Sequence, residues 1–330
     1  MHPAGNFRKT NEDISSRVPL CNMKCIVTGG AGFIGSHLTD LLVSQGHEVV
    51  VIDSMVAGRE ENLSAVLDKI TLIKKDLLTD GWQSAFSGAD RVYHIAADPD
   101  VRGSARKSWE VYENNVTATV RVLEAMKQYE VKEIVFTSTS TVYGEASVIP
   151  TPETYSPMIP ISIYAASKLA CEAMISSYAA TYNWHAWVYR FANIIGPRST
   201  HGVIYDFVQK LRANPKELEI LGDGTQSKSY LSVFECVKGM VFAPTISHDV
   251  FNFFNIGSED WVSVKQIAEL VVEEMGLKDV KFNFTGGDRG WVGDVPKMQL
   301  GVDKLKSFGW EPGTTSVDSV RMAIRATIEE

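Results

Sequence analysis

The sequence has only four cysteines in 330 residues, and Cys21, Cys25, Cys171 and Cys236 show no regular pairing. Few, irregular cysteines exclude a small disulfide scaffold and are typical of a reducing compartment, so we expect a cytoplasmic protein. Cys21-x-x-x-Cys25 resembles half of a metal site, but no second half follows it. We therefore expect no metal.

Long apolar runs and an excess of basic charge are also missing. No apolar run reaches the ~18 residues that a membrane span needs, so no membrane partner is expected. The net charge is −8 and the charges are dispersed, unlike a nucleic-acid-binding surface. The chain has no evident repeat or low-complexity tract. The composition fits a soluble protein, and the length of 330 residues suggests one large domain or two.

The first 22 residues differ from the rest of the chain. They are polar and lack the apolar core of a signal peptide. They precede Met23-Lys-Cys-Ile-Val, where the first apolar strand pattern begins. We predict that residues 1–22 form a flexible tail.

A glycine-rich turn follows the first apolar run. Gly29, Gly32 and Gly35 lie between a buried strand predicted over Cys25–Val27 and a helix predicted over Phe33–Val43. Glycines permit a tight turn and let a pyrophosphate approach the backbone, and the helix N-terminus supplies unpaired N–H groups and partial positive charge. This order of elements predicts a dinucleotide site.

An acidic residue completes the dinucleotide pattern. A second apolar strand, Glu48–Ile52, ends at Asp53, 18 residues after Gly35, where a carboxylate that binds the adenosine ribose is expected. Its charge would repel a 2′-phosphate, which favours NAD over NADP. Arg59 lies close enough to keep NADP as an alternative.

Strand and helix patterns then alternate along the chain. Strand-like runs lie at Ile70–Lys75, Arg91–Ile95, Ile134–Thr137 and Ala186–Arg190, and helical patterns lie at 108–129 and 164–183. Such alternation predicts an α/β fold with a doubly wound parallel sheet, which binds ligands at the carboxyl ends of its strands. Asp76-Leu77, His94–Ala97 and Thr137–Thr141 follow strands. His94 has no partner at metal-ligand spacing, so we expect it to pack in its strand.

A tyrosine–lysine pair is the strongest catalytic motif. In Tyr164-Ala-Ala-Ser-Lys168 the phenol and the ammonium share one helix face. A tyrosine base needs a pKa well below about 10, and a neighbouring cation lowers a phenol pKa. The pair alone is common on helices as a half-buried aromatic with a solvated amine. Its position after the dinucleotide pattern predicts catalysis.

Together these segments resemble the extended short-chain dehydrogenase/reductase family, and within it the NAD-dependent epimerase/dehydratases of the UDP-glucose 4-epimerase type. The matching segments are Thr28–Gly35, Thr137–Gly144, Tyr164–Lys168, Arg190–Arg198 and Leu221–Val233. His201–Phe207 and Gly290–Asp294 look most like archaeal-type members. The resemblance implies a Rossmann sheet, a smaller mixed α/β C-terminal substrate domain, and a homodimer.

The resemblance also implies a division of the chain and a second set of helices. The NAD-binding domain would span residues 23–192, and residues 193–330 would mainly form the substrate domain, with a return to the large domain near residues 250–262. Helical patterns lie at 203–212, 233–246, 264–275 and 317–327. The cleft between the two parts would hold the sugar nucleotide.

Residue roles are carried over by position. The NAD contacts implied by the resemblance are Gly29, Gly32, Phe33, Ile34, Gly35, Asp53, Ser54, Gly58, Asp76, Leu77, Ala96, Ala97, Asn115, Thr137, Tyr164 and Lys168. The catalytic set would be Thr139, Tyr164 and Lys168, with Tyr164 as the base and Lys168 both holding the nicotinamide ribose and lowering the tyrosine pKa. Thr139 lies 25 residues before Tyr164, the family spacing for the catalytic hydroxyl.

The implied substrate contacts are Thr139, Thr141, Asn193, Lys228, Tyr230, Arg289 and Met298. Two positions depart from the family pattern. Lys228-Ser229 stands where Arg-Asp is usual, which keeps the charge but loses the bidentate fork. Trp291 stands at the offset of a late family arginine, and Arg289 lies two residues earlier.

The implied activity is 4-epimerisation of a UDP-sugar, with UDP-glucose and UDP-galactose as the main pair. Tyr164 would take the O4 proton while C4 gives hydride to NAD, and the 4-keto sugar would rotate before hydride returns to its other face. Met298 is unbranched and deformable, so we expect some activity on N-acetylated sugars. Hexose, N-acetylhexosamine and uronic acid substrates share these motifs, as do different nucleotides.

Three other functions are open to a chain of this type. A 4,6-dehydratase needs a further acid and base, and such relatives carry Asp-Glu where this chain has Ser140-Thr141. A UDP-glucuronate decarboxylase would have an acid at the same strand end. A non-catalytic NAD-binding sensor commonly loses the tyrosine or the lysine, and both are present here.

Overall fold

The computed structural model describes residues 22–287, 295 and 297–330. Residues 1–21 of the predicted tail, Arg289 and the Gly290–Asp294 stretch lie outside this part of the chain.

Seven parallel strands form the large sheet in the order β11-β6-β5-β4-β1-β2-β3. Their bounds are β1 (Lys24–Thr28), β2 (Glu48–Asp53), β3 (Ile70–Lys74), β4 (Arg91–His94), β5 (Glu133–Thr139), β6 (His185–Phe191) and β11 (Phe251–Ile256). The middle residues of the inner strands are mostly apolar and buried, because helices cover both faces of the sheet. The predicted α/β doubly wound fold is confirmed.

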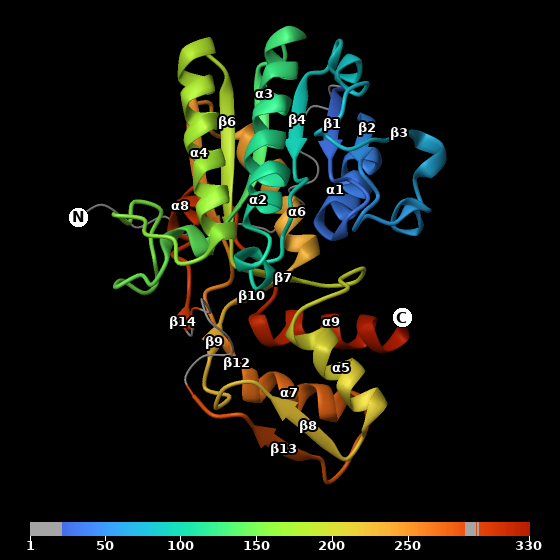
Figure 1. Ribbon diagram of the computed structural model, residues 1–330, viewed down its shortest axis with the longest axis vertical. Coiled ribbons are helices and arrows are strands. Elements are labelled where there is room, and N and C mark those ends of the chain that lie inside the picture. The colour runs from blue at the N-terminus through green and yellow to red at the C-terminus, as the bar shows by residue number, and fades with distance from the viewer. Residues whose placement is uncertain (1–21, 288–294, 296) are drawn as a thin grey trace, which may run out of the picture.

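Successive strand residues point into two separate cores. On one face Val27 and Val49 pack with α1 (Phe33–Ser44) and α6 (Val233–Phe242). On the other face Ile26 and Val50 pack with α3 (Ala118–Gln128) and α4 (Ile163–Tyr182). This period-2 alternation is the sequence origin of the three layers visible in Figure 1.

The helix predicted over 108–129 is divided. It consists of α2 (Ser108–Tyr112), a π-helical turn η6 (Glu113–Thr117) and α3. The side chain of Thr119 donates to the Asn115 carbonyl oxygen at 2.6 Å, and Asn115 is fully buried. π-turns of this kind are frequent at functional sites.

A smaller group of elements lies below the sheet in Figure 1. Helices α5 (Val203–Ala213), α7 (Val264–Glu274) and α9 (Ser316–Glu329) pack with the parallel pair β8 (Glu217–Ile220) and β13 (Lys281–Phe284) around their own core. The short strands are β7 (Asn193–Ile195), β9 (Ser227–Lys228), β10 (Tyr230–Ser232), β12 (Val262–Ser263) and β14 (Lys297–Met298). The helix α8 (Asp303–Ser307) was not predicted.

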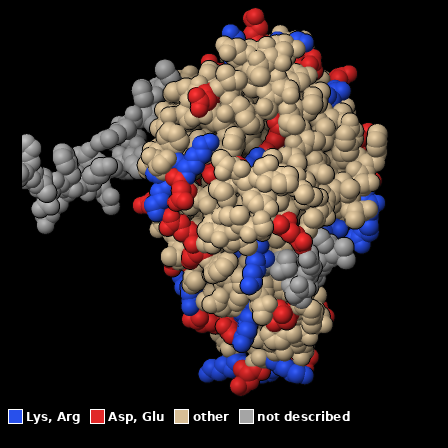
Figure 2. Space-filling view, turned by 90° about the vertical axis from the view of Figure 1, so that its left-hand side faces the viewer, with Lys and Arg blue, Asp and Glu red and all other residues tan. Residues whose placement is uncertain are grey.

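Short 3-10 turns occupy several connections: η2 (Glu60–Leu63), η3 (Leu67–Lys69), η4 (Gln83–Phe86), η5 (Gly103–Ala105), η7 (Ser140–Tyr143) and η8 (Ala243–Thr245). None of the helices that the structure describes is long and apolar enough to span a membrane. Figure 2 shows acidic and basic side chains interspersed over the face it presents, without an extended area of one sign.

Candidate active site

A cavity of about 1110 Å³ lies at the carboxyl ends of the large sheet's strands. Its lining combines the ends of β1, β2, β4 and β5 with residues of α5, β9, β10 and β14. Ligand pockets commonly measure about 300–1,000 Å³, so this cavity has room for more than one ligand.

The glycine-rich turn forms one wall of the cavity. Gly29 has a φ of +72°, and a Cβ there would lie 2.7 Å from the Ala96 nitrogen. A Cβ on Gly35 would lie 2.0 Å from the Gly29 carbonyl oxygen, so these two glycines are required by the fold itself. Gly32 has no such crowding, because its added Cβ would meet only one atom, at 3.3 Å. Its missing side chain leaves the backbone open to a ligand.

The start of α1 fits a pyrophosphate. Gly32 is the N-cap residue and provides no side-chain cap, and the first turn holds no acidic residue. The N–H groups of Phe33, Ile34 and Gly35 therefore have no helical carbonyl partner. All four residues line the cavity, so unpaired donors and the positive end of the helix face it together.

The predicted ribose carboxylate lies where β2 ends. Asp53 accepts hydrogen bonds from the backbone nitrogens of Ala31 at 3.0 Å and Met55 at 2.8 Å, which hold its carboxylate at the cavity wall. A Cβ on Gly58 would lie 2.6 Å from Asp53 Oδ1, so a side chain there would displace the carboxylate. Ser54 and Gly58 line the same region.

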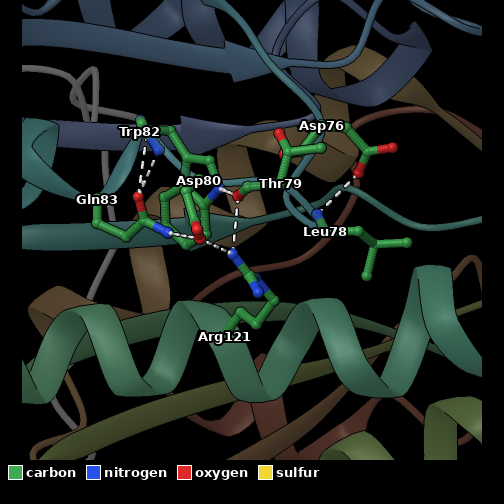
Figure 3. A network of polar contacts seen from close by, with 8 residues as sticks. Asp76, Leu78, Thr79, Asp80, Trp82, Gln83 and Arg121 are labelled. Carbon is green, nitrogen blue, oxygen red and sulfur yellow. Dashed lines mark hydrogen bonds and ion pairs between the residues drawn. The ribbon is translucent and has the colours of Figure 1, made fainter.

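The loop after β3 carries the predicted adenine contacts Asp76 and Leu77, and both line the cavity. Figure 3 shows how the loop is held: Asp76 Oδ1 accepts from the Leu78 nitrogen at 2.8 Å, and Arg121 on α3 donates to the Thr79 carbonyl oxygen at 2.8 Å. Arg121 also pairs with Asp80 at 2.5 Å. The loop is thereby fixed to the helix layer.

One predicted cofactor contact has a different position. Ala96 and Ala97 line the cavity, but Asn115 is buried behind them and its neighbour Asn114 lines the cavity in its place. The Asn115 amide accepts from the Asp98 nitrogen at 2.7 Å and donates to Ser167 Oγ at 2.9 Å. Asn115 therefore connects the loop after β4 with α4 and does not face the dinucleotide channel.

His94 is packed in its strand, as expected. Its Nδ1 and Nε2 share hydrogen bonds with the hydroxyls of Thr28 at 2.7 Å and Thr119 at 2.9 Å. Burial, with a smaller contribution from Lys168, lowers the pKa of His94 to about 3, so its ring is neutral. It supports the strand ends from below.

The three predicted catalytic residues meet at one edge of the cavity. Thr139 ends β5, and Tyr164 and Lys168 lie one turn apart on α4, whose start is capped by Ser162. The Lys168 ammonium donates to the Thr137 carbonyl oxygen at 2.9 Å and lies 4.7 Å from the centre of the Phe136 ring. The structure thus brings strand end and helix motif together.

Burial is the largest influence on the pKa values of Tyr164 and Lys168. Burial raises the pKa of Tyr164, and a hydrogen bond with Thr139 acts in the opposite direction. Burial also lowers the pKa of Lys168 to about 8. Lys168 is not among the groups that shift the Tyr164 pKa here, and Thr139 is the neighbour that lowers it.

A buried ion pair supports the catalytic strand end. Arg190 on β6 and Glu172 on α4 pair at 2.6 Å, and both side chains are nearly inaccessible. Ser138, which precedes Thr139, donates to Glu172 Oε1 at 2.5 Å. Arg190 also donates to Tyr143 Oη at 3.0 Å. This network ties β5, β6 and α4 together below the catalytic hydroxyl.

The predicted substrate residues that the structure describes also line the cavity. Thr141, Asn193, Lys228, Tyr230 and Met298 line it, whereas Arg289 lies outside the described residues. Thr141 and Thr139 share a hydrogen bond at 3.0 Å between their hydroxyls. Met298 is also packed against the buried cluster that contains Val142 and Leu300, so it lines the cavity and fills core at once.

Sequence reasoning missed several residues of the cavity wall. Asp98, Lys107 and Gln226 line it, as does the segment 199–206. Asp98 and Lys107 pair at 3.1 Å. Gln226 had a detectable signal, because it precedes Lys228 and Tyr230 at the two-residue spacing of one strand face.

A Rossmann sheet that places a tyrosine–lysine pair beside a dinucleotide turn is the arrangement of a nicotinamide-dependent short-chain dehydrogenase/reductase. The NAD dependent epimerase/dehydratase family model matches residues 25–257, and the chain belongs to that family. NAD is its cofactor, and the cradle formed by Gly32, the start of α1 and Asp53 fits this group.

The chain is similar to known epimerases over most of its length. A solved UDP-galactose 4-epimerase is 42% identical, with a TM-score of 0.84, over 93% of this chain and 99% of that one. An uncharacterized UDP-glucose epimerase of Bacillus subtilis strain 168 is 34% identical over 78% of this chain and 83% of the relative. A UDP-N-acetylglucosamine 4-epimerase from Methanobrevibacter ruminantium M1, solved with UDP-N-acetylmuramic acid, has a TM-score of 0.85 and 26% identity, over 93% of this chain and 99% of that one.

Proposed function

We propose that the protein is an NAD-dependent 4-epimerase of a nucleotide sugar, with UDP-glucose and UDP-galactose as its main pair. The observation that carries the proposal is the composition of the catalytic edge. A tyrosine and a threonine that can move one proton line the cavity, and Ser140 and Thr141, rather than acids, follow Thr139. The 4-epimerase names of the solved neighbours support the same reaction.

The carboxylates of the cavity argue against a dehydratase or a decarboxylase. Those that line it in the described part of the chain are Asp53, Asp76, Asp98 and Asp206. Asp53 and Asp76 belong to the adenosine end. Asp98 is the one that influences the Tyr164 pKa, and it is paired with Lys107. An acid–base pair beside the tyrosine, which elimination at C5 and C6 would need, is therefore lacking among these groups.

The residues would act on one proton. Tyr164 would accept the O4 proton of the sugar, and Thr139, hydrogen-bonded to it, would hold O4 and steady the proton during transfer. When bound, NAD supplies the hydride acceptor and a positive charge in the same cavity, which lowers a phenol pKa. Lys168, already fixed to the Thr137 carbonyl, would hold the nicotinamide ribose.

Inversion requires the keto sugar to turn its other face to the cofactor. Lys228 would hold the diphosphate while the sugar turns, and the size of the cavity leaves room for the movement. Met298 lies opposite Lys228 in the β9–β14 pair and can deform. We therefore expect a lower but measurable rate on the N-acetylated pair.

We also propose that the protein works as a cytoplasmic homodimer. Trp109 and Tyr112 on α2 are 68% and 45% exposed, and their rings stack at 5.4 Å. Exposed aromatic residues are enriched at interfaces. The surface formed by α2 and the adjoining α4 is where we expect the second copy.

Asp53→Asn is expected to narrow the preference for NAD over NADP by about tenfold, because a 2′-phosphate no longer meets a like charge. The single amide oxygen keeps an acceptor for one of the two backbone donors, Ala31 or Met55. Titration of NAD and of NADP into wild-type protein and into Asp53→Asn measures the ratio of the two dissociation constants in each protein. Arg59→Ala serves as the control for a cationic contribution. A wild-type protein that binds NADP more tightly than NAD would contradict the assignment.

A product analysis tests the proposed function. The protein is incubated with UDP-glucose, UDP-galactose, their N-acetylated counterparts, UDP-glucuronate and a GDP-hexose, and the C4 epimers are resolved by NMR. We expect interconversion of UDP-glucose and UDP-galactose without consumption of NAD. A stable 4-keto-6-deoxy sugar would instead indicate a dehydratase, release of carbon dioxide a decarboxylase, and no turnover of any sugar a sensor.

A further inference from the structure

Gln226 has an unusual environment for an amide. Its side chain is 3% exposed, and neither Nε2 nor Oε1 has a hydrogen-bond partner among the residues that the structure describes. Its backbone carbonyl accepts from the Val264 nitrogen at 2.9 Å, so the position of the residue is fixed. A buried polar group without a partner has lost its hydrogen bonds to water and gained none, and native proteins keep few such groups.

The side chain belongs to the cavity wall. Gln226, Lys228 and Tyr230 all line the cavity, whereas Ser227 and Ser229 between them do not. This alternation is that of one face of an extended strand, on which residues two apart lie about 7 Å from each other. Three polar side chains thus form a row along the cavity.

The three side chains of this row follow one another along the cavity in the order Tyr230, Lys228 and Gln226. Tyr230 is paired with Asn193 in the β7–β10 ladder, and Lys228 is paired with Met298 in the β9–β14 ladder. Gln226 is the member farthest from Tyr230. Near its place in the chain, Leu221 and Val264 add apolar side chains to the cavity wall. A nucleotide sugar whose diphosphate is held at Lys228 would extend its nucleoside toward Gln226.

The chemistry of the amide narrows what can satisfy it. An amide carries two donors on nitrogen and an acceptor on oxygen. Ionised phosphate offers acceptors only, so it would leave Oε1 unpaired. A nucleoside offers both kinds of group, on the edge of its base and on its ribose hydroxyls. We propose that Gln226 is the residue that binds the nucleoside of the substrate, an inference that rests on the proposed function.

The test measures the coupling between this side chain and single groups of the ligand. UDP, 3-methyl-UDP and 2′-deoxy-UDP are titrated by calorimetry into NAD-saturated wild-type protein, Gln226→Met and Gln209→Met. Gln209 lies on α5 and does not line the cavity, so the same chemical change there is the matched control. Melting temperatures of the three proteins without nucleotide are measured in parallel.

We expect Gln226→Met to weaken UDP binding about tenfold and Gln209→Met to leave it unchanged. In wild-type protein, one of the two analogues should bind more weakly than UDP. In Gln226→Met, that analogue and UDP should bind with equal affinity. Coupling to 3-methyl-UDP assigns the base edge, and coupling to 2′-deoxy-UDP assigns the ribose. The melting temperature of Gln226→Met should be equal to or above that of wild type, because an unpaired amide has been removed.

The opposite results are equally definite. Unchanged UDP affinity in Gln226→Met overturns the assignment, and this is the result expected if a trapped water satisfies the amide. The assignment is also overturned if each analogue loses as much affinity in Gln226→Met as it does in wild-type protein. A marked fall in melting temperature would show a structural role and also overturn it. If wild-type protein epimerises UDP-sugars while Gln226→Met binds UDP normally, only this inference fails. If wild type binds NAD but no UDP, the proposed function fails with it.

Discussion

Tyr164→Phe is expected to lower the epimerisation rate by about 10²–10⁴-fold while NAD binding and the melting temperature stay close to wild type. The substitution removes one hydroxyl, the group that would take the O4 proton and that is hydrogen-bonded to Thr139. Single-turnover kinetics with saturating sugar nucleotide measures the chemical step directly.

The same substitution on the same helix provides the control. Tyr178 lies on α4, does not line the cavity, and donates its hydroxyl proton to Glu124 at 2.5 Å. Tyr178→Phe should therefore turn over as wild type does. Near-normal turnover in Tyr164→Phe would remove this residue from the mechanism, and an equal loss in both variants would show a general effect of altering α4.

Glu172→Ala is expected to lower the free energy of unfolding by about 3–5 kcal/mol, because it leaves the Arg190 guanidinium buried without its counter-charge. It also leaves the Ser138 hydroxyl without its acceptor beside the catalytic Thr139. Urea unfolding followed by fluorescence or circular dichroism measures the change.

A double variant separates the loss of the pair from the loss of a single charge. In Glu172→Met/Arg190→Met both charges are replaced by apolar groups, so most of the stability should return. Arg321 and Glu274 form an ion pair at 2.7 Å outside the buried network, and Glu274→Ala should change stability far less. If the free energy of unfolding of Glu172→Ala lies within about 1 kcal/mol of the wild-type value, the buried ion pair does not stabilise the fold as proposed.

Most of the fold could be predicted from local sequence patterns. Apolar strands, the Gly29–Gly35 turn and Asp53 can be predicted because each depends on neighbours in the chain: strand periodicity, turn geometry and a fixed spacing. Tyr164 and Lys168 could be placed together because a helix fixes the spacing between them. The structure confirms the doubly wound sheet, and the family comparison confirms the family.

Side-chain burial and hydrogen bonds between distant residues could not be predicted from the sequence. Asn115 was expected to face the cofactor, but it lies in the π-turn η6 and its amide is hydrogen-bonded to Asp98 and Ser167. The burial that raises the Tyr164 pKa also depends on the folded chain and cannot be read from the Tyr164–Lys168 spacing.

Pairing between distant elements is the other limit. Glu172 and Arg190 come from a helix and a strand, and nothing in their spacing announces an ion pair. The spacing of Gln226 to Lys228 and Tyr230 is visible in the sequence, but its burial and its two unpartnered atoms are not. Both features depend on the folded chain rather than on local sequence.

The most direct test of the account follows one deuterium atom. UDP-galactose labelled with deuterium at C4 is incubated with the protein in ordinary water, and the UDP-glucose formed is examined by NMR and mass spectrometry. The account predicts inversion at C4 with the deuterium retained there, because bound NAD would supply hydride chemistry in which the hydrogen returns to the carbon that it left. Loss of the deuterium to solvent, or a product without inversion at C4, would contradict it.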